Sequence, residues 1–128
     1  MSEILELENE CFPSGFWNRS QILSHLNSFS ALGIYSDNLL SAYVLFSSAA
    51  EETEIFRIGT RVRFRRKGLS GKLIQELEKI SASILLEVSS RNIEAQRLYE
   101  KSGFRLSGRR KKYYSDDSDA LIFKKIRA

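Results

Sequence analysis

Residues 83–88, SILLEV, constrain the fold most strongly, because a short apolar run of this kind is typical of a strand buried on both faces of a sheet. Apolar residues at helical spacing precede it over residues 69–80. A second amphipathic pattern follows over residues 92–102, and Gly103 is expected to end that helix. A buried strand between two amphipathic helices predicts a sheet with helices packed on its faces.

The remaining patterns predict a hairpin, a third strand and a terminal pair of strands. The predicted elements are, in order, helices over residues 4–12 and 18–29, strands over 31–35, 39–46 and 53–62, a helix over 69–80, a strand over 83–88, a helix over 92–102, and strands over 104–114 and 120–126. This order indicates an α/β (α+β) fold with a mixed central sheet flanked by helices. No repeat or linker interrupts the chain, so we expect residues 1–128 to form a single domain.

Composition narrows the class of protein. The single cysteine, Cys11, excludes an intrachain disulfide and a cysteine-based metal site, and His25 has no second ligand near it in the sequence, so no metal is expected. No apolar run approaches the ~18 residues of a membrane span, and the acidic N-terminus does not resemble a signal peptide. We therefore expect a cytoplasmic protein that does not enter a membrane.

The charges are divided unevenly between the two parts of the chain. Residues 1–56 contain one basic and eight acidic residues, whereas residues 57–128 contain nineteen basic and eight acidic residues. The basic part favours a polyanionic ligand. The acidic part suggests that its glutamates, Glu8, Glu10, Glu51, Glu52 and Glu54, steer a basic substrate. Alternatively, the uneven distribution of charge is an accident of surface composition and has no function.

The most basic stretch, RFRRKGLSGKL over residues 63–73, surrounds two glycines. It is not a Walker loop, because Arg66 and Leu73 stand where glycine and Ser/Thr are required. Gly68 lets the backbone turn at the start of a helix, whose free N–H groups favour an anion. Seven basic residues accompany this turn: Arg57, Arg61, Arg63, Arg65, Arg66, Lys67 and Lys72. A pyrophosphate site is one interpretation, and a solvated turn is the other.

Two motifs resemble one family. The pattern from Arg65 through Gly68 to Ser70 is similar to the Gln/Arg-x-x-Gly-x-Gly/Ala signature of the GNAT superfamily of N-acetyltransferases, with Ser70 in place of Gly or Ala. Residues 85–104, LLEVSSRNIEAQRLYEKSGF, resemble the RimI-type branch, which acetylates the N-terminal alanine of a ribosomal protein. The resemblance covers most of the chain from Cys11 onward.

The resemblance implies a GNAT-like sheet, here possibly without the family's usual first strand, and an acetyl-CoA cosubstrate. It implies that residues 56–60 splay from the strand at residues 83–88 and that the pantetheine arm lies in the gap. The residues it assigns to acetyl-CoA binding are Ile58, Gly59, Thr60, Arg65, Arg66, Lys67, Gly68, Leu69, Ser70, Gly71, Asn92 and Tyr99.

Glu87 and Tyr99 are the candidate catalytic residues. A carboxylate in an apolar strand should face a cleft or pair with an arginine, and burial would raise its pKa as a general base requires. The resemblance implies that Glu87 accepts the proton of the attacking amine, directly or through water. The spacing of Tyr99 alone is typical of an aromatic residue in the core. The resemblance instead implies that Tyr99 protonates the coenzyme A thiolate.

We therefore predict an acetyl-CoA-dependent N-acetyltransferase in which an amine attacks the thioester directly. The expected acceptor is the N-terminal α-amino group of a protein such as a ribosomal protein. The alternatives are a GNAT enzyme acting on a lysine or a small amine (polyamine, aminoglycoside) and a catalytically silent GNAT-like module that binds RNA or protein. Nucleic acid is not an expected partner, and the sequence leaves the oligomeric state open.

Overall fold

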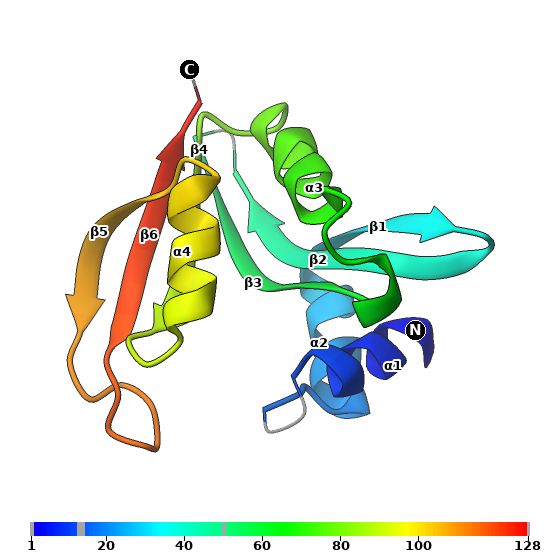
Figure 1. Cartoon of the computed structure of the whole chain (residues 1–128), viewed down its shortest axis with the longest axis horizontal. Helices are drawn as coiled ribbons and strands as arrows, with labels where there is room; N and C mark the ends of the chain where they lie inside the picture. Colours follow the sequence, from blue (N-terminus) through cyan, green and yellow to red (C-terminus); the bar gives the residue numbers. More distant parts are fainter. Residues whose placement is uncertain (1, 13–14, 50, 128) are drawn as a thin grey trace.

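The computed structural model describes residues 2–12, 15–49 and 51–127, and its elements follow the predicted order (Figure 1). The helices are α1 (Ser2–Cys11), α2 (Arg19–Ser28), α3 (Leu69–Glu78) and α4 (Ile93–Lys101), with a 3-10 turn η1 (Val62–Phe64). The strands are β1 (Ser30–Ser36), β2 (Leu39–Ser48), β3 (Glu52–Thr60), β4 (Ser83–Ser89), β5 (Arg105–Arg110) and β6 (Ala120–Ile126). Among the described residues, no helix is long and apolar enough to cross a membrane.

One six-stranded sheet has the order β1-β2-β3-β4-β6-β5. Only β3 and β4 pair in parallel, whereas the other neighbours are antiparallel, which confirms the expected mixed sheet. The helix α3 connects the two parallel strands, as a crossover connection must. Within the described part of the chain no strand precedes α1, and β1 and β5 form the two edges of the sheet.

Helices cover both faces of the sheet. The larger core lies under α3 and α4, where α3 buries Leu69, Leu73, Ile74 and Leu77 against the sheet. A smaller core lies on the opposite face, where Leu7 of α1 packs against β2. The helix α2 follows α1 after a short connection and begins at a capping box formed by Asn18 and Gln21.

The strands β3 and β4 stay together for only half their length. Residues 52–55 pair with residues 83–86, and beyond them β3 bends away from β4 (Figure 1). A bulge lies at this bend, because Ile55 and Arg57 face consecutive residues of β2 and Phe56 is the extra residue. The separation expected for residues 56–60 is therefore present, and it opens a gap in the middle of the sheet.

Three details of the sequence interpretation were wrong. The strand β4 is buried mainly on one face, at Ile84, Leu86 and Val88. Its other face carries Leu85, Glu87 and Ser89, which are only partly buried, and Glu87 pairs there with Arg110. The third strand ends at Thr60 because η1 follows it, and β5 ends at Arg110 because the chain turns there, with Lys112 in a left-handed conformation.

Candidate active site

The gap between β3 and β4 brings Ile58, Gly59 and Thr60 to one side of the proposed site. Ile58 packs against the larger core. A Cβ on Gly59 would lie 3.0 Å from the Tyr43 ring of β2 and 3.1 Å from the Cys11 sulfur of α1, so a side chain at this position would crowd both elements. The Thr60 carbonyl accepts a bond from Arg65 Nε at 2.9 Å, which fastens the basic loop to the end of β3.

The basic loop presents the uncapped start of α3. Gly68 has a left-handed backbone conformation (φ +74°) immediately before the helix and offers no side chain to its first turn. A Cβ at either Gly68 or Gly71 would meet nothing within 4 Å, so the loop borders open space. The Ser70 hydroxyl lies 3.0 Å from that of Thr60. The free N–H groups and the helix dipole make this a site suited to an anion.

Five of the seven predicted cations remain at the loop, but two do not. Arg61 is buried, donates to the Leu40 carbonyl at 3.0 Å and pairs with Glu6 at 2.7 Å. Arg57 pairs with Glu8 at 2.9 Å on the α1 side of the sheet. The expectation that all seven basic residues accompany the turn was therefore wrong for Arg57 and Arg61, since each is held by a carboxylate of α1.

The helix α4 brings Asn92 and Tyr99 toward the same face as α3. The Asn92 side chain caps the helix by accepting a bond from the Ala95 N–H at 3.1 Å. Tyr99 packs edge to face against Phe104, with ring centres 5.7 Å apart. Burial raises the pKa of Tyr99 to about 12, so its hydroxyl keeps its proton at neutral pH. Such a hydroxyl can donate a proton but cannot serve as a base.

Glu87 lies on the opposite face of the sheet, where it pairs with Arg110 at 3.4 Å. The Glu87 side chain is 22% exposed, and the pairing with an arginine is one of the two arrangements expected from the sequence. Glu54 of β3 shares this face. Burial, followed by the negative charge of Glu87, raises the pKa of Glu54 above its ordinary value. Burial and the charge of Glu87 also raise the pKa of Tyr114 in the C-terminal hairpin.

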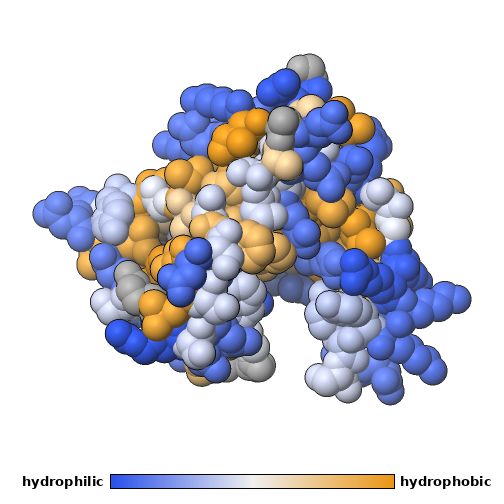
Figure 2. Space-filling view, turned by 180° about the vertical axis from the view of Figure 1, so that it is seen from behind, coloured by the Kyte–Doolittle hydropathy of each residue, from blue (hydrophilic) through white to orange (hydrophobic). Residues whose placement is uncertain are grey.

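On the face that Figure 2 shows from behind, a notch separates the α1–α2 region from the tip of the β5–β6 hairpin. The loop of α3 and the carboxylates therefore occupy opposite faces of one gap. The sequence interpretation missed the proximity of Glu54 to Glu87 and the ion pair between Glu87 and Arg110. The alignment of β3 with β4 would have revealed the first, because Glu54 faces Leu85, two residues before Glu87.

The glutamates expected to steer a substrate do not act together. Glu8 is fully buried and therefore cannot attract a distant ligand, which corrects that expectation. Glu10 accepts a bond from the Val62 N–H at 2.6 Å, and Glu52 pairs with Lys124. Within the described residues no group of three or more His, Cys, Asp or Glu side chains is placed to hold a metal ion.

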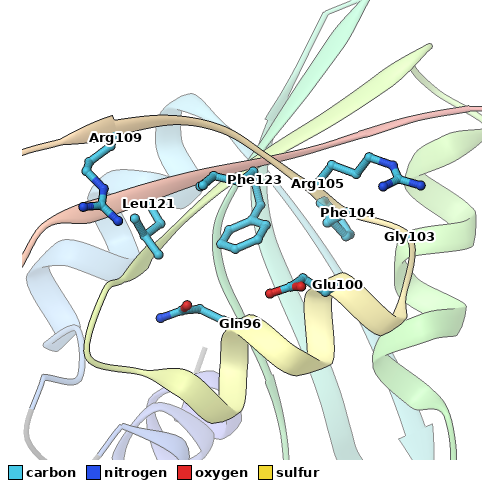
Figure 3. A pocket seen from close by; sticks show the side chains of 9 residues that line it. Gln96, Glu100, Gly103, Phe104, Arg105, Arg109, Leu121 and Phe123 are labelled. Carbon is cyan, nitrogen blue, oxygen red and sulfur yellow. The ribbon is translucent and has the colours of Figure 1, made fainter.

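A separate hollow of about 450 Å³ lies between α4 and the β5–β6 pair (Figure 3). Phe104, Leu121 and Phe123 form an apolar floor, and Glu100 points toward it from α4. None of the predicted site residues lines this hollow. It is therefore distinct from the gap between β3 and β4.

Comparison with known proteins agrees with this architecture. A model of the Acetyltransferase (GNAT) family matches residues 1–104. A Bacillus subtilis (strain 168) protein, named as a candidate ribosomal protein bS18-alanine N-acetyltransferase, is 30% identical over 131 residues, which cover 95% of this chain and 86% of that protein.

Two solved structures share the fold. The ribosomal-protein-S18-alanine N-acetyltransferase from Escherichia coli superposes with a TM-score of 0.85 at 22% identity, covering 98% of this chain and 86% of that chain. A GNAT family acetyltransferase from Elizabethkingia anophelis, solved with acetyl-CoA bound, superposes with a TM-score of 0.77 at 18% identity, covering 95% and 89%.

Proposed function

Because the chain belongs to the GNAT family of acetyltransferases, which use acetyl-CoA, we propose that it acetylates the N-terminal α-amino group of a protein such as a ribosomal protein. The observation that carries this proposal is the separation of β3 from β4, with a basic, uncapped helix start on one face and Glu87 on the other. With such an acceptor, the enzyme works in the cytoplasm. We further propose that residues 1–128 act as a single domain.

The acetyl-CoA side of the site is formed by β3, the basic loop and α4. The pyrophosphate would accept bonds from the first N–H groups of α3, with exposed cations of the loop around it. The pantetheine arm would lie in the gap and pair with the backbone edge that β3 leaves free. The residues that we assign to acetyl-CoA binding are Ile58, Gly59, Thr60, Arg65, Arg66, Lys67, Gly68, Leu69, Ser70, Gly71, Asn92 and Tyr99.

The reaction requires one attack and two proton transfers. The neutral amine nitrogen attacks the thioester carbonyl carbon and forms a C–N bond, and collapse of the tetrahedral intermediate breaks the C–S bond. Glu87 accepts the proton that the amine loses, and the Tyr99 hydroxyl gives a proton to the departing thiolate. A backbone N–H near Gly59 or Thr60 would stabilise the oxyanion. The products are the acetylated amine and coenzyme A.

The ordinary pKa of the attacking amine favours an α-amino group as the acceptor. An α-amino group has an ordinary pKa of about 7.7–8.0, so roughly a tenth of it is neutral at pH 7, whereas a lysine with a pKa of about 10.4 is almost wholly charged. Glu87 is partly exposed and ion-paired, which suits a reaction that needs only mild assistance from a base. The name of the Bacillus subtilis relative points to the same acceptor class.

An acetyl-transfer assay with peptides and small amines tests this function. We expect peptides with a free N-terminus to react, and we expect Glu87→Gln and Tyr99→Phe each to lower kcat by about 10²- to 10⁴-fold, as loss of a general base or acid does. Both variants should still bind acetyl-CoA. If no amine reacts while acetyl-CoA binds, the chain is a silent member of the family. If only lysines or small amines react, the proposed acceptor is wrong.

A further inference from the structure

A fully buried carboxylate lies under the segment that joins α1 to α2. Glu8 has no exposed surface and accepts hydrogen bonds from three parts of the chain. The Trp17 N–H donates to Oε1 at 2.7 Å, the Tyr43 hydroxyl donates to Oε2, and Arg57 Nη2 donates to Oε1 at 2.9 Å. Burial and the charge of Glu8 raise the pKa of Tyr43, so its hydroxyl remains a donor. Glu8 therefore connects the α1–α2 segment to β2 and β3.

Arg57 makes the second connection. Its Nη2 also donates to the Gly15 carbonyl at 2.8 Å, so one guanidinium bridges Glu8 and the backbone of the segment. The guanidinium carbon lies 4.0 Å from the centre of the Phe12 ring and 5.6 Å from that of Trp17. Among described residues, residues 15–17 form hydrogen bonds with Glu8 and Arg57, and the Gly15 N–H donates to the Phe12 carbonyl at 3.1 Å.

The segment held in this way borders the acceptor face. Trp17 lines a hollow of about 540 Å³ together with α2 and Phe56. Phe56 precedes Arg57 on β3 and lies two residues beyond Glu54, a distance of roughly 7 Å along a strand. The positive charge of Arg57 also acts on Tyr114, which feels the charge of Glu87. The Glu8–Arg57 pair is therefore close to the proposed acceptor without belonging to the reacting groups.

We propose that the buried Glu8–Arg57 pair positions residues 15–17, and with them Trp17, as one wall of the acceptor site. In this arrangement the pair sets the affinity for the acceptor and leaves the chemical step and acetyl-CoA binding to other residues. The proposal rests on the function proposed above, because it assigns a role within that site. Glu8 and Arg57 are positioning residues.

Arg57→Lys tests the proposal because it keeps the positive charge and removes the planar guanidinium, whose several N–H groups can bind two partners at once. One ammonium cannot hold Glu8 and the Gly15 carbonyl as the guanidinium does. We expect the KM for the acceptor to rise about tenfold, the loss of roughly one charged hydrogen bond, with kcat and the KM for acetyl-CoA within about twofold of wild type. Trp17 is the only tryptophan, so its fluorescence should also become more accessible to acrylamide.

Arg61→Lys is the matched control. Arg61 is likewise buried and paired with a carboxylate of α1, Glu6, but its guanidinium bonds to Leu40 and Glu6 rather than to residues 15–17. Its loss should lower stability and leave both the Trp17 quenching and the acceptor KM unchanged. The double variant Glu8→Gln with Arg57→Met separates position from stability. Removing both charges together leaves no unpaired buried charge, which limits the loss of stability, yet Met cannot bind the Gly15 carbonyl, so the acceptor KM should stay raised.

Two results would overturn the proposal. One is an Arg57→Lys protein whose Trp17 quenching and acceptor KM equal those of the wild type. The other is an acceptor KM that returns to the wild-type value in the double variant, because the pair would then act on folding alone. If the wild-type protein acetylates no N-terminus, the proposed function fails, and the Trp17 quenching still decides whether the pair holds the segment.

Discussion

Ser70→Glu separates the stability of α3 from its affinity for acetyl-CoA. Ser70 is the second residue of α3 and lies beside an uncapped helix start. A carboxylate in the first helical turn stabilises a helix by about 0.3–1 kcal/mol, because it faces the positive end of the helix dipole. The substitution also removes the hydroxyl contact with Thr60, which costs about 0.5–1.5 kcal/mol. These changes nearly cancel, so the free protein should keep its stability within about 1 kcal/mol.

The effect on binding should be much larger. A pyrophosphate at the start of α3 would be a close neighbour of the new carboxylate, at a charge separation on the order of 4 Å. Two like charges at that distance repel each other by about 4 kcal/mol at an effective dielectric constant near 20. A penalty of this size lowers the affinity for acetyl-CoA by about 10³-fold. Screening by salt should reduce the penalty, because the loop is exposed.

Isothermal titration with acetyl-CoA and thermal unfolding of the free protein measure the two effects. Ser70→Gln is the matched control, since it has the size of glutamate without its charge. We expect Ser70→Gln to retain most of the affinity and Ser70→Glu to lose about three orders of magnitude. An unchanged acetyl-CoA affinity in Ser70→Glu would refute the assignment of the pyrophosphate to this helix start.

Three further predictions concern single side chains. The raised pKa of Glu54 means that its negative charge destabilises the folded protein, so Glu54→Gln should raise the free energy of unfolding at pH 7. Urea unfolding should show that this gain shrinks as the pH falls toward 4, where Glu54 itself becomes neutral. A variant less stable than the wild type at pH 7 would contradict this prediction. The wild-type protein should lose stability as the pH rises from about 10, the ordinary pKa of tyrosine, to about 12, the pKa of Tyr99 in the folded protein. In alkaline unfolding, Tyr99→Phe should lose less stability over this range. Equal losses in the two proteins would argue against a protonated, buried Tyr99. Asn92→Ala removes the cap of α4 and should lower the free energy of unfolding by about 1 kcal/mol. The alanine variant should therefore show a lower Tm, and Asn92→Asp should restore it. An unchanged Tm in the alanine variant would show that the cap contributes nothing to stability.

The order of the elements could be predicted because each depends on local spacing. Apolar residues at helical spacing identified α3, and Gly103, which adopts a positive φ of +101° after α4, marked the end of that helix. The start of α2 at Asn18 likewise follows from a local capping box. These signals act within a few residues, so the sequence shows them directly.

Contacts between distant parts of the chain could not be predicted in the same way. Arg57 and Arg61 read as part of one basic stretch, and only the packing of α1 across β2 and β3 pairs them with Glu8 and Glu6. The bulge at Phe56 depends on the register with β2, which no local pattern encodes. The phosphate-binding residues remain predictions for the same reason, because their assignment depends on a ligand as well as on the chain.

The position of the transferred acetyl group tests the central claim most directly. A peptide with an N-terminal alanine and an internal lysine offers both classes of amine to the enzyme at once. After incubation with acetyl-CoA, fragment-ion mass spectrometry shows which nitrogen has been acetylated. The proposed function predicts acetylation of the α-nitrogen, and no product from the same peptide with a blocked N-terminus. Acetylation of the lysine, with the α-nitrogen left free, would contradict it.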